Sequence, residues 1–274
     1  MNDSRVASKA PLRILCQQEH GSCAACCGVS NFYDRSDAAM HRRLQRRTAL
    51  VLAAWPDESE LARARDQLLA EEAPEVLFAA VKVCPFAGHV DDDARVGCLL
   101  HPTRHPTGAD LRDLAVYPKE VCAGHFCASH DWLRPREADL AQSARGSVYG
   151  RVVTDAALVK AVARAVDDVL CRGWVSADLA GAGAELGALW TLLLQEWPFV
   201  DPDPRRFGGF FFDGADAIER SLPSACFGLS VAVSAPERII IDAIGTRPLD
   251  DADGAAALGL LRGGLARVAR AMGR

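Results

Sequence analysis

The sequence predicts an α+β protein in two parts. A cysteine-rich, mainly helical, metal-binding half at residues 1–145 precedes a half of mixed helices and antiparallel strands at residues 146–274. Apolar residues recur at helical spacing in both parts, with short β-like segments between the helices. Eight of the ten cysteines and all seven histidines occur at or before residue 130. Because the chain turns polar and loop-like after residue 134, we place the domain boundary near residue 145.

Two helices are expected early in the first half. Ser36 or Asp37 suits the N-cap of a helix over residues 36–55, and a second helix restarts after Pro56 with Asp57 or Ser59 as its cap. Apolar residues follow at helical spacing in both segments.

A hairpin with one cysteine on each arm is expected next. Residues 81–86 and 96–100 are β-like and flank a polar turn at residues 91–93. A loop at 101–110 and a short helix at 110–117 then lead into a segment rich in soft ligands. This segment holds Cys122, His125, Cys127 and His130.

The second half is expected to combine helices and strands. Helical patterns cover residues 154–173, 184–197 and 250–272. Residues 207–214 are predicted to be a strand, and residues 226–245 to form a hairpin across Ser234–Glu237.

Composition excludes several classes of partner. The net charge of −5 gives no bulk attraction to nucleic acid or anionic lipid. No apolar run approaches the roughly 18 residues of a membrane-spanning helix, and the first 16 residues do not have the pattern of a signal peptide. We therefore expect a cytoplasmic protein. In a reducing cytosol, a cysteine cluster more often binds metal or performs redox chemistry than forms disulfides.

The stretch "HGSCAACCG" is the centre of the predicted metal site. Two alanines separate Cys23 from Cys26 and Cys27, and Gly28 permits a turn that aims backbone amides at sulfur. Thiolates are ligands for zinc and for iron–sulfur clusters. A four-ligand shell could combine two of these cysteines with Cys84 and Cys98, or with Cys122 and Cys127. Eight cysteines exceed the need of one tetrahedral ion, which leaves a second site or a multinuclear cluster open.

These residues resemble the YkgJ-like cysteine-cluster family, described as a zinc- or iron-chelating domain. That family carries the run C-x-x-C-x-x-C-C, then C-P-F, then a cysteine before two apolar residues, then a final cysteine. The resemblance covers about residues 20–130. It implies metal ligation by Cys23, Cys26, Cys27, Cys84, Cys98 and either Cys122 or Cys127. His20 stands where the family's first cysteine would be, so it is a candidate ligand of different charge.

The function expected from the sequence is metal binding through cysteine thiolates, with an iron–sulfur cluster or zinc as cofactor. One alternative is a cluster-dependent enzyme, because flagellin lysine N-methylase resembles the same family, or an enzyme with Cys27 as nucleophile and His20 or His125 as base. Another is a zinc-stabilised interaction module whose second half binds a protein partner. His101 and His125 are further candidate ligands. We interpret Cys16, Cys171 and Cys226 as small buried hydrophobic residues.

Overall fold

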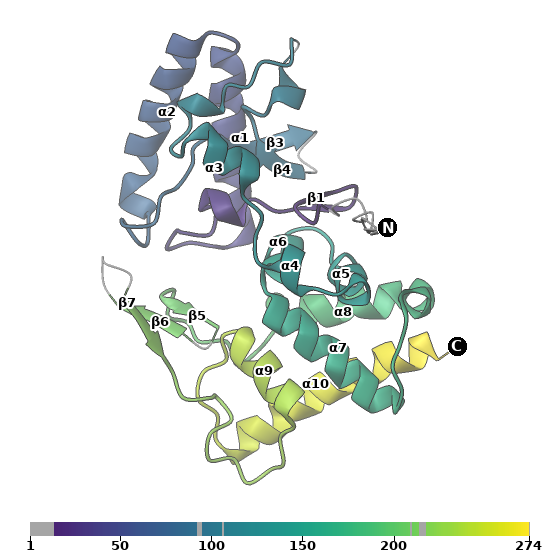
Figure 1. Ribbon diagram of the computed structural model, residues 1–274. Helices are drawn as coiled ribbons and strands as arrows, with labels where there is room; N and C mark the ends of the chain where they lie inside the picture. The colour runs from purple at the N-terminus through teal and green to yellow at the C-terminus, as the bar shows by residue number, and fades with distance from the viewer. Residues whose placement is uncertain (1–13, 92–94, 106, 209, 214–217, 274) are drawn as a thin grey trace, which may run out of the picture.

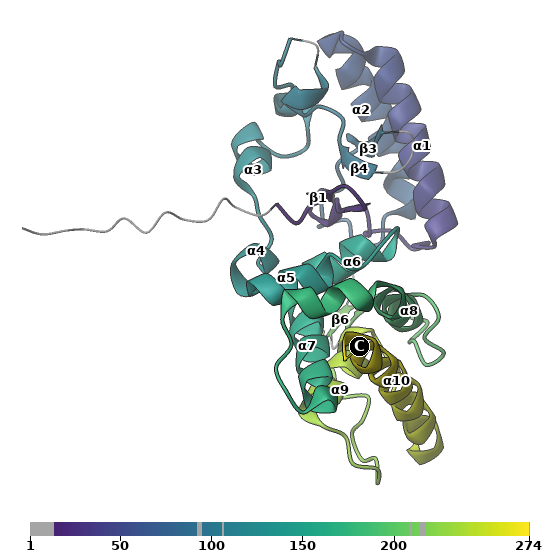
Figure 2. The same cartoon turned by 90° about the vertical axis from the view of Figure 1, so that its right-hand side faces the viewer.

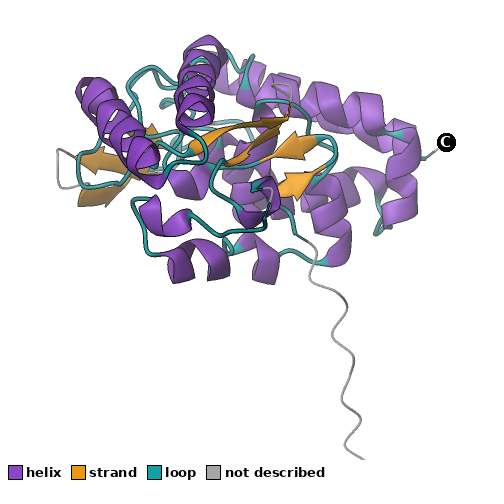
Figure 3. Ribbon diagram, turned by 90° about the horizontal axis from the view of Figure 1, so that it is seen from above, coloured by secondary structure: helices purple, strands orange, loops and turns teal. Residues whose placement is uncertain are grey.

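The computed structural model describes residues 14–91, 95–105, 107–208, 210–213 and 218–273. Within these residues, helices combine with three small antiparallel sheets (Figure 1), which confirms the predicted mixture of helix and strand. Seen from above, the strands are short and lie among the helices (Figure 3).

The first half contains a helix pair and two short hairpins. Its elements are β1 (Gln17–Gln18), β2 (Gly21–Ser22), the 3₁₀ helix η1 (Ala25–Cys27), α1 (Asp37–Ala54), α2 (Glu58–Glu72), β3 (Ala87–Asp91), β4 (Arg95–Cys98), α3 (Lys119–Gly124) and α4 (Ser129–Trp132). The β1–β2 hairpin lies between the α1–α2 pair and helix α6 of the second half in both side views (Figures 1 and 2).

The helix pair begins at the predicted caps. Ser36 Oγ accepts the Ala39 N–H at 3.3 Å, and Asp57 Oδ1 accepts the Ser59 N–H at 2.8 Å. These side chains satisfy backbone donors that have no partner within the first helical turn. Both predicted helices are therefore confirmed.

A buried ion pair joins the two helices to the cysteine hairpin. Arg47 is 1% exposed and donates to Glu72 Oε2 at 2.6 Å and to Oε1 at 2.7 Å. The same guanidinium donates to the carbonyl of Cys84 at 3.3 Å. The pair thereby fixes the backbone of Cys84 against α1 and α2.

The predicted hairpin forms, with a shifted first arm. β3 pairs antiparallel with β4, and Cys98 lies opposite Ala87. The expectation for residues 81–86 was wrong, because Cys84 precedes the strand. Pro85 has no N–H to donate to a strand ladder, so pairing starts after it. The centre of the turn, residues 92–94, lies outside the described residues.

The second half is mainly helical. Its helices are α6 (Val148–Thr154), α7 (Ala156–Leu170), α8 (Gly183–Leu194), α9 (Ala235–Ala243) and α10 (Asp251–Met272). Helix α5 (Pro135–Ala141) precedes the predicted boundary and packs against α6 and α7. The strands of the second half are β5 (Arg206–Phe207), β6 (Phe210–Asp213) and β7 (Ile218–Ser221), paired in that order. The prediction of a single strand at 207–214 was wrong, because the chain turns at Gly208 and forms two antiparallel strands, β5 and β6. Residues 209 and 214 lie outside the described part of the chain.

Two further expectations of secondary structure were wrong. Residues 235–243 form helix α9 rather than a strand, because Ser234 and Glu237 make a capping box and Pro236 occupies the first turn. These start signals outweigh the strand preference of the isoleucine run. Residues 226–234 are turn and loop. The expected helix at 110–117 is one 3₁₀ turn at Arg112–Leu114, which Asp110 begins by accepting the Arg112 N–H.

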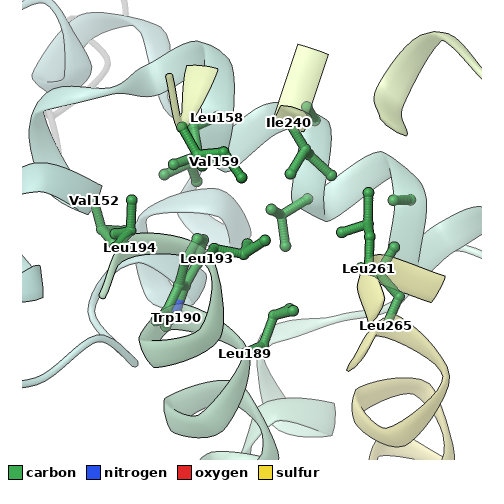
Figure 4. Packing of buried hydrophobic residues seen from close by; sticks show 14 of the residues in the cluster. Val152, Leu158, Val159, Leu189, Trp190, Leu193, Leu194, Ile240, Leu261 and Leu265 are labelled. Carbon is green, nitrogen blue, oxygen red and sulfur yellow. The ribbon is translucent and has the colours of Figure 1, made fainter. Parts of the chain in front are cut away.

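The largest hydrophobic core lies in the second half. Side chains of α6, α7, α8, α9 and α10 converge in it, with Trp190, Val159 and Leu261 fully buried (Figure 4). Leu15, from the start of the described chain, belongs to the same core. The predicted domain boundary near residue 145 stays a prediction.

None of the helices in the described residues is both long and apolar enough to cross a membrane. The segment that we compared with a signal peptide lies mostly in residues 1–13, outside the described residues.

Candidate metal centre

The Cys23–Gly28 loop forms the turn that its sequence predicts. Ala25 N–H points at Cys23 Sγ, with a nitrogen–sulfur distance of 3.4 Å, and residues 25–27 form η1. Gly28 ends this turn at φ 75°, and a Cβ there would lie 2.5 Å from the Lys82 carbonyl oxygen. Only glycine combines this backbone angle with such a close approach. Gly28 therefore brings the cysteine loop against the loop before β3 that contains Cys84.

The loop before β3 presents Cys84 to the cysteine loop, and the end of β4 supplies Cys98. Cys84 N–H donates to the Cys27 carbonyl at 2.9 Å. The Cys84 sulfur accepts hydrogen bonds from the backbone N–H groups of Phe86 and Val116, and Cys98 accepts one from Leu100. Cys23, Cys84 and Cys98 thus each accept an amide N–H from the residue two positions later. Such bonds stabilise negative charge on sulfur and tune the potential of thiolate-bound iron.

The segment after the hairpin supplies Cys122. Asp110 holds the Arg112 guanidinium at 2.6 Å, and Arg112 Nη1 donates to the Cys122 carbonyl at 3.5 Å. The hydrogen bond from Arg112 lowers the pKa of Asp110 to about 2, so the pair is charged at neutral pH. Sequence analysis did not identify Arg112. The acidic residue two positions before it, Asp110, could have indicated the ion pair.

Four thiols from separate parts of the chain form what we call the first thiol set: Cys27, Cys84, Cys98 and Cys122. Cys98 interacts electrostatically with Cys84 and Cys122, and Cys27 with Cys84 and Cys98. Burial raises the pKa of Cys98 to about 12 and raises that of Cys84. Without a bound cation these thiols are neutral, because their surroundings disfavour the thiolate.

A second group lies at the open end of the β1–β2 hairpin. Cys23 N–H donates to the Cys16 carbonyl at 2.9 Å, and the charge of Cys127 acts on both thiols. Burial raises the pKa of Cys16 to about 11 and that of Cys23 to about 12. We call Cys16, Cys23, Cys26 and Cys127 the second thiol set. The interpretation of Cys16 as a hydrophobic residue was wrong, because it is only half-buried and lies among other thiols.

The adjacent cysteines differ in environment. Cys26 is exposed, whereas Cys27 is mostly covered. The Cys27 thiol donates a hydrogen bond to the Cys26 sulfur, which lowers the pKa of Cys26 to about 6 and raises that of Cys27. The positive charge of His125 also favours the Cys26 thiolate.

The remaining candidates fall outside these sets. His20 lies exposed on the β1–β2 turn, 3.8 Å from Glu19, and its role as a ligand stays a prediction. His101 is partly buried, and its Nδ1 contacts Thr103 Oγ1 at 2.8 Å. Cys226 is buried in the large core as expected, whereas Cys171 is exposed, contrary to its interpretation as a buried residue.

Within the described residues, no three His, Cys, Asp or Glu side chains converge closely enough to hold one metal ion as they stand. A tetrahedral zinc with Zn–S bonds of about 2.3 Å requires sulfurs about 3.8 Å apart. An iron–sulfur cluster places its own iron and sulfide atoms between the cysteine sulfurs, so its ligands stand farther apart.

Comparisons of the whole chain with protein families, with characterised proteins and with solved structures find no match in any of the three.

Proposed function

We propose that this chain is a metal-binding protein that holds an iron–sulfur cluster through cysteine thiolates, with zinc as the alternative metal. The observation that carries the proposal is the first thiol set. Cys27, Cys84, Cys98 and Cys122 come from four separate segments, and their charges interact. Four thiolates complete the ligand shell of either cofactor.

The backbone around the set supports a cation. Amide N–H groups point at the sulfurs of Cys84 and Cys98, although burial disfavours their thiolates. A neutral thiol gains little from such donors, whereas a thiolate bound to metal gains from each of them. The resemblance to the YkgJ-like cysteine-cluster family supports the same class of ligand set.

A cluster-dependent enzyme and a zinc-stabilised interaction module are the alternatives. An enzyme needs an open coordination position on the metal, whereas in a purely structural site protein ligands occupy all four positions. Cys26 is exposed, and the charge of His125 favours its thiolate. A reactive thiolate near the first thiol set would suit the enzyme hypothesis. Under the hypothesis of an interaction module, the second half, which has its own large core, would bind the protein partner.

The test is metal analysis of protein purified without oxygen, with acid-labile sulfide and a visible spectrum measured on the same sample. We expect iron and sulfide in wild type and their loss in Cys84→Ser. Cys171→Ser, at an exposed cysteine outside both sets, is the matched control and should keep its metal. Stoichiometric zinc without colour would support the structural reading. Protein without iron or zinc would refute the proposal.

A further inference from the structure

We propose that the chain carries two thiolate metal sites, the second formed by Cys16, Cys23, Cys26 and Cys127 beside the first thiol set. This inference rests on the metal-binding function proposed above and extends it to a cysteine outside the family's motif. The eight cysteines before residue 130 then divide into two groups of four, each sufficient for one zinc ion or one iron–sulfur cluster.

The β1–β2 hairpin brings the first two ligands together. Gln17 pairs with Ser22 and Gln18 with Gly21, so Cys16 and Cys23 flank the hairpin at its open end. Their backbones are joined by a hydrogen bond of 2.9 Å. A tight hairpin thereby places two thiols seven positions apart in the sequence next to each other, as a C-x-x-C turn does over a shorter span.

Helix α6 packs against this group of cysteines. Cys23 Sγ lies 3.8 Å from the Gly150 carbonyl oxygen, and Cys127 Sγ lies 4.0 Å from the Val153 carbonyl oxygen. Cys127 comes from the segment between α3 and α4, and its charge acts on Cys16 and Cys23. The first half thus meets α6 at this set, and Figure 2 shows β1 beside α6.

His130 supports Cys127 without being a ligand. His130 Nε2 accepts the Leu15 N–H at 3.1 Å, so the proton of the neutral ring is on Nδ1. Nδ1 lies 3.5 Å from Cys127 Sγ and 3.3 Å from the Cys127 carbonyl oxygen. An N–H directed at a cysteine sulfur stabilises its thiolate and tunes a bound metal.

A buried hydroxyl supports a polar ligand at this position. Ser129 lies two residues after Cys127 and is 1% exposed, and its Oγ has no hydrogen-bond partner among the described residues. A buried hydroxyl without a partner is unfavourable, so its surroundings favour a polar group.

The two sites explain why two cysteines are adjacent. Cys27 interacts with Cys84 and Cys98, whereas the charge of Cys26 acts on Cys16 and Cys23. Successive side chains of a 3₁₀ helix point about 120° apart, so Cys26 and Cys27 leave η1 in different directions, although their sulfurs hydrogen-bond to each other. The charge of Cys26 also reaches Cys122, which places Cys26 at the boundary between the sets. Because Cys122 completes the first set, we assign Cys26 to the second.

The test compares metal content per chain in wild type and single variants purified without oxygen. Wild type should contain two equivalents of the same metal unit. Cys16→Ser and Cys23→Ser should each lose about half of the metal, and Cys98→Ser should lose the other half. Cys171→Ser should lose none. Hydrogen exchange of α7, α8 and α10 checks that each variant keeps the fold of the second half.

The outcomes separate the two proposals. One equivalent in wild type, unchanged in Cys16→Ser but absent in Cys98→Ser, would overturn the second site and leave the proposed function standing. Wild type without metal would refute both.

A second measurement needs no variant. Wild-type protein is alkylated with iodoacetamide before and after metal removal, and each cysteine is followed by mass spectrometry. We expect Cys16, Cys23 and Cys127 to become reactive only after metal removal, together with the first set. Equal labelling of these three cysteines in both states would contradict the second site.

Discussion

The two halves of the molecule differ in how much apolar surface they bury. In the second half, helices α6 to α10 share one continuous core, which α5 joins through Ala138, Leu140 and Ala141. In the first half, the buried apolar residues form two small separate clusters, one of seven residues around Phe86 and one of four around Leu44. Small cores rarely stabilise a fold alone, and natural proteins supplement them with metals or disulfides. We infer that the second half is stabilised by packing and the first by its thiol sets.

Metal removal tests this comparison most directly. Treatment with a chelator should unfold the first half while the second half remains folded, because the free energy of metal binding is part of the folding free energy at such sites. Hydrogen exchange followed by mass spectrometry should show loss of amide protection in α1, α2, β3 and β4, with α7, α8 and α10 still protected. Equal loss in both halves would mean that the two cores unfold as one unit.

Substitution at the buried ion pair should have the next largest effect. Glu72→Gln removes the charge opposite Arg47, which is 1% exposed, and should cost about 3–5 kcal/mol in the free energy of unfolding. Glu71→Gln breaks the neighbouring surface pair with Arg46 and should cost less than about 1 kcal/mol. Urea denaturation of the metal-loaded protein measures both. Similar costs for the two variants would show that burial of Arg47 does not matter.

Truncation of the large core should destabilise the second half without releasing metal. Leu189 is fully buried on α8, and Leu189→Ala should cost about 2–5 kcal/mol. Leu260→Ala, at a position 41% exposed on α10, is the control and should change stability little. Metal content should equal that of wild type in both variants. Metal loss in Leu189→Ala would show that packing of the helical half sets the thiol geometry.

Gly28→Ala should have a smaller effect that is concentrated at the cysteine loop. A residue other than glycine in this left-handed conformation costs about 1–2 kcal/mol, and the added Cβ would also meet the Lys82 carbonyl at 2.5 Å. Gly108→Ala separates the two causes, because Gly108 has φ +73° with nothing within 4 Å. Gly28→Ala should therefore lower both stability and metal content, and Gly108→Ala only stability. Equal metal content in the two variants would count against the role of Gly28.

Local signals in the sequence were sufficient for the elements with strong caps. Ser36 and Asp57 begin α1 and α2 as expected, because an N-cap acts through contacts within a few residues. Helix α9 was missed, although Ser234, Pro236 and Glu237 carry its start signal, because we gave more weight to the isoleucine run. The shift of β3 was predictable from Pro85 alone.

All the cysteines of the two proposed sets except Cys16 were candidates from the sequence, but their division between two sets could not be predicted. The spacing identified Cys23, Cys26 and Cys27 as candidates. It could not assign Cys26 and Cys27 to different sets, because that depends on how η1 is oriented against the hairpin. Cys16 was missed because it stands seven residues before Cys23, outside any short motif. The segment "CQQEHGSC" carried a weak signal, since a short hairpin within it brings its two cysteines together. The contacts with α6 depend on tertiary packing and leave no local signal.

Leu15 and Cys16 are consecutive residues that belong to different halves. Leu15 is buried in the helical core, and its carbonyl accepts the Tyr149 hydroxyl at 2.7 Å, while Cys16 lies in the second thiol set. A rigid peptide unit therefore joins a residue of the helical core to a residue of the second thiol set. A ligand that moved α6 would change the affinity for metal, and metal would change the affinity for that ligand by the same factor. In this sense the first described residues of the chain couple the helical half to the thiols thermodynamically.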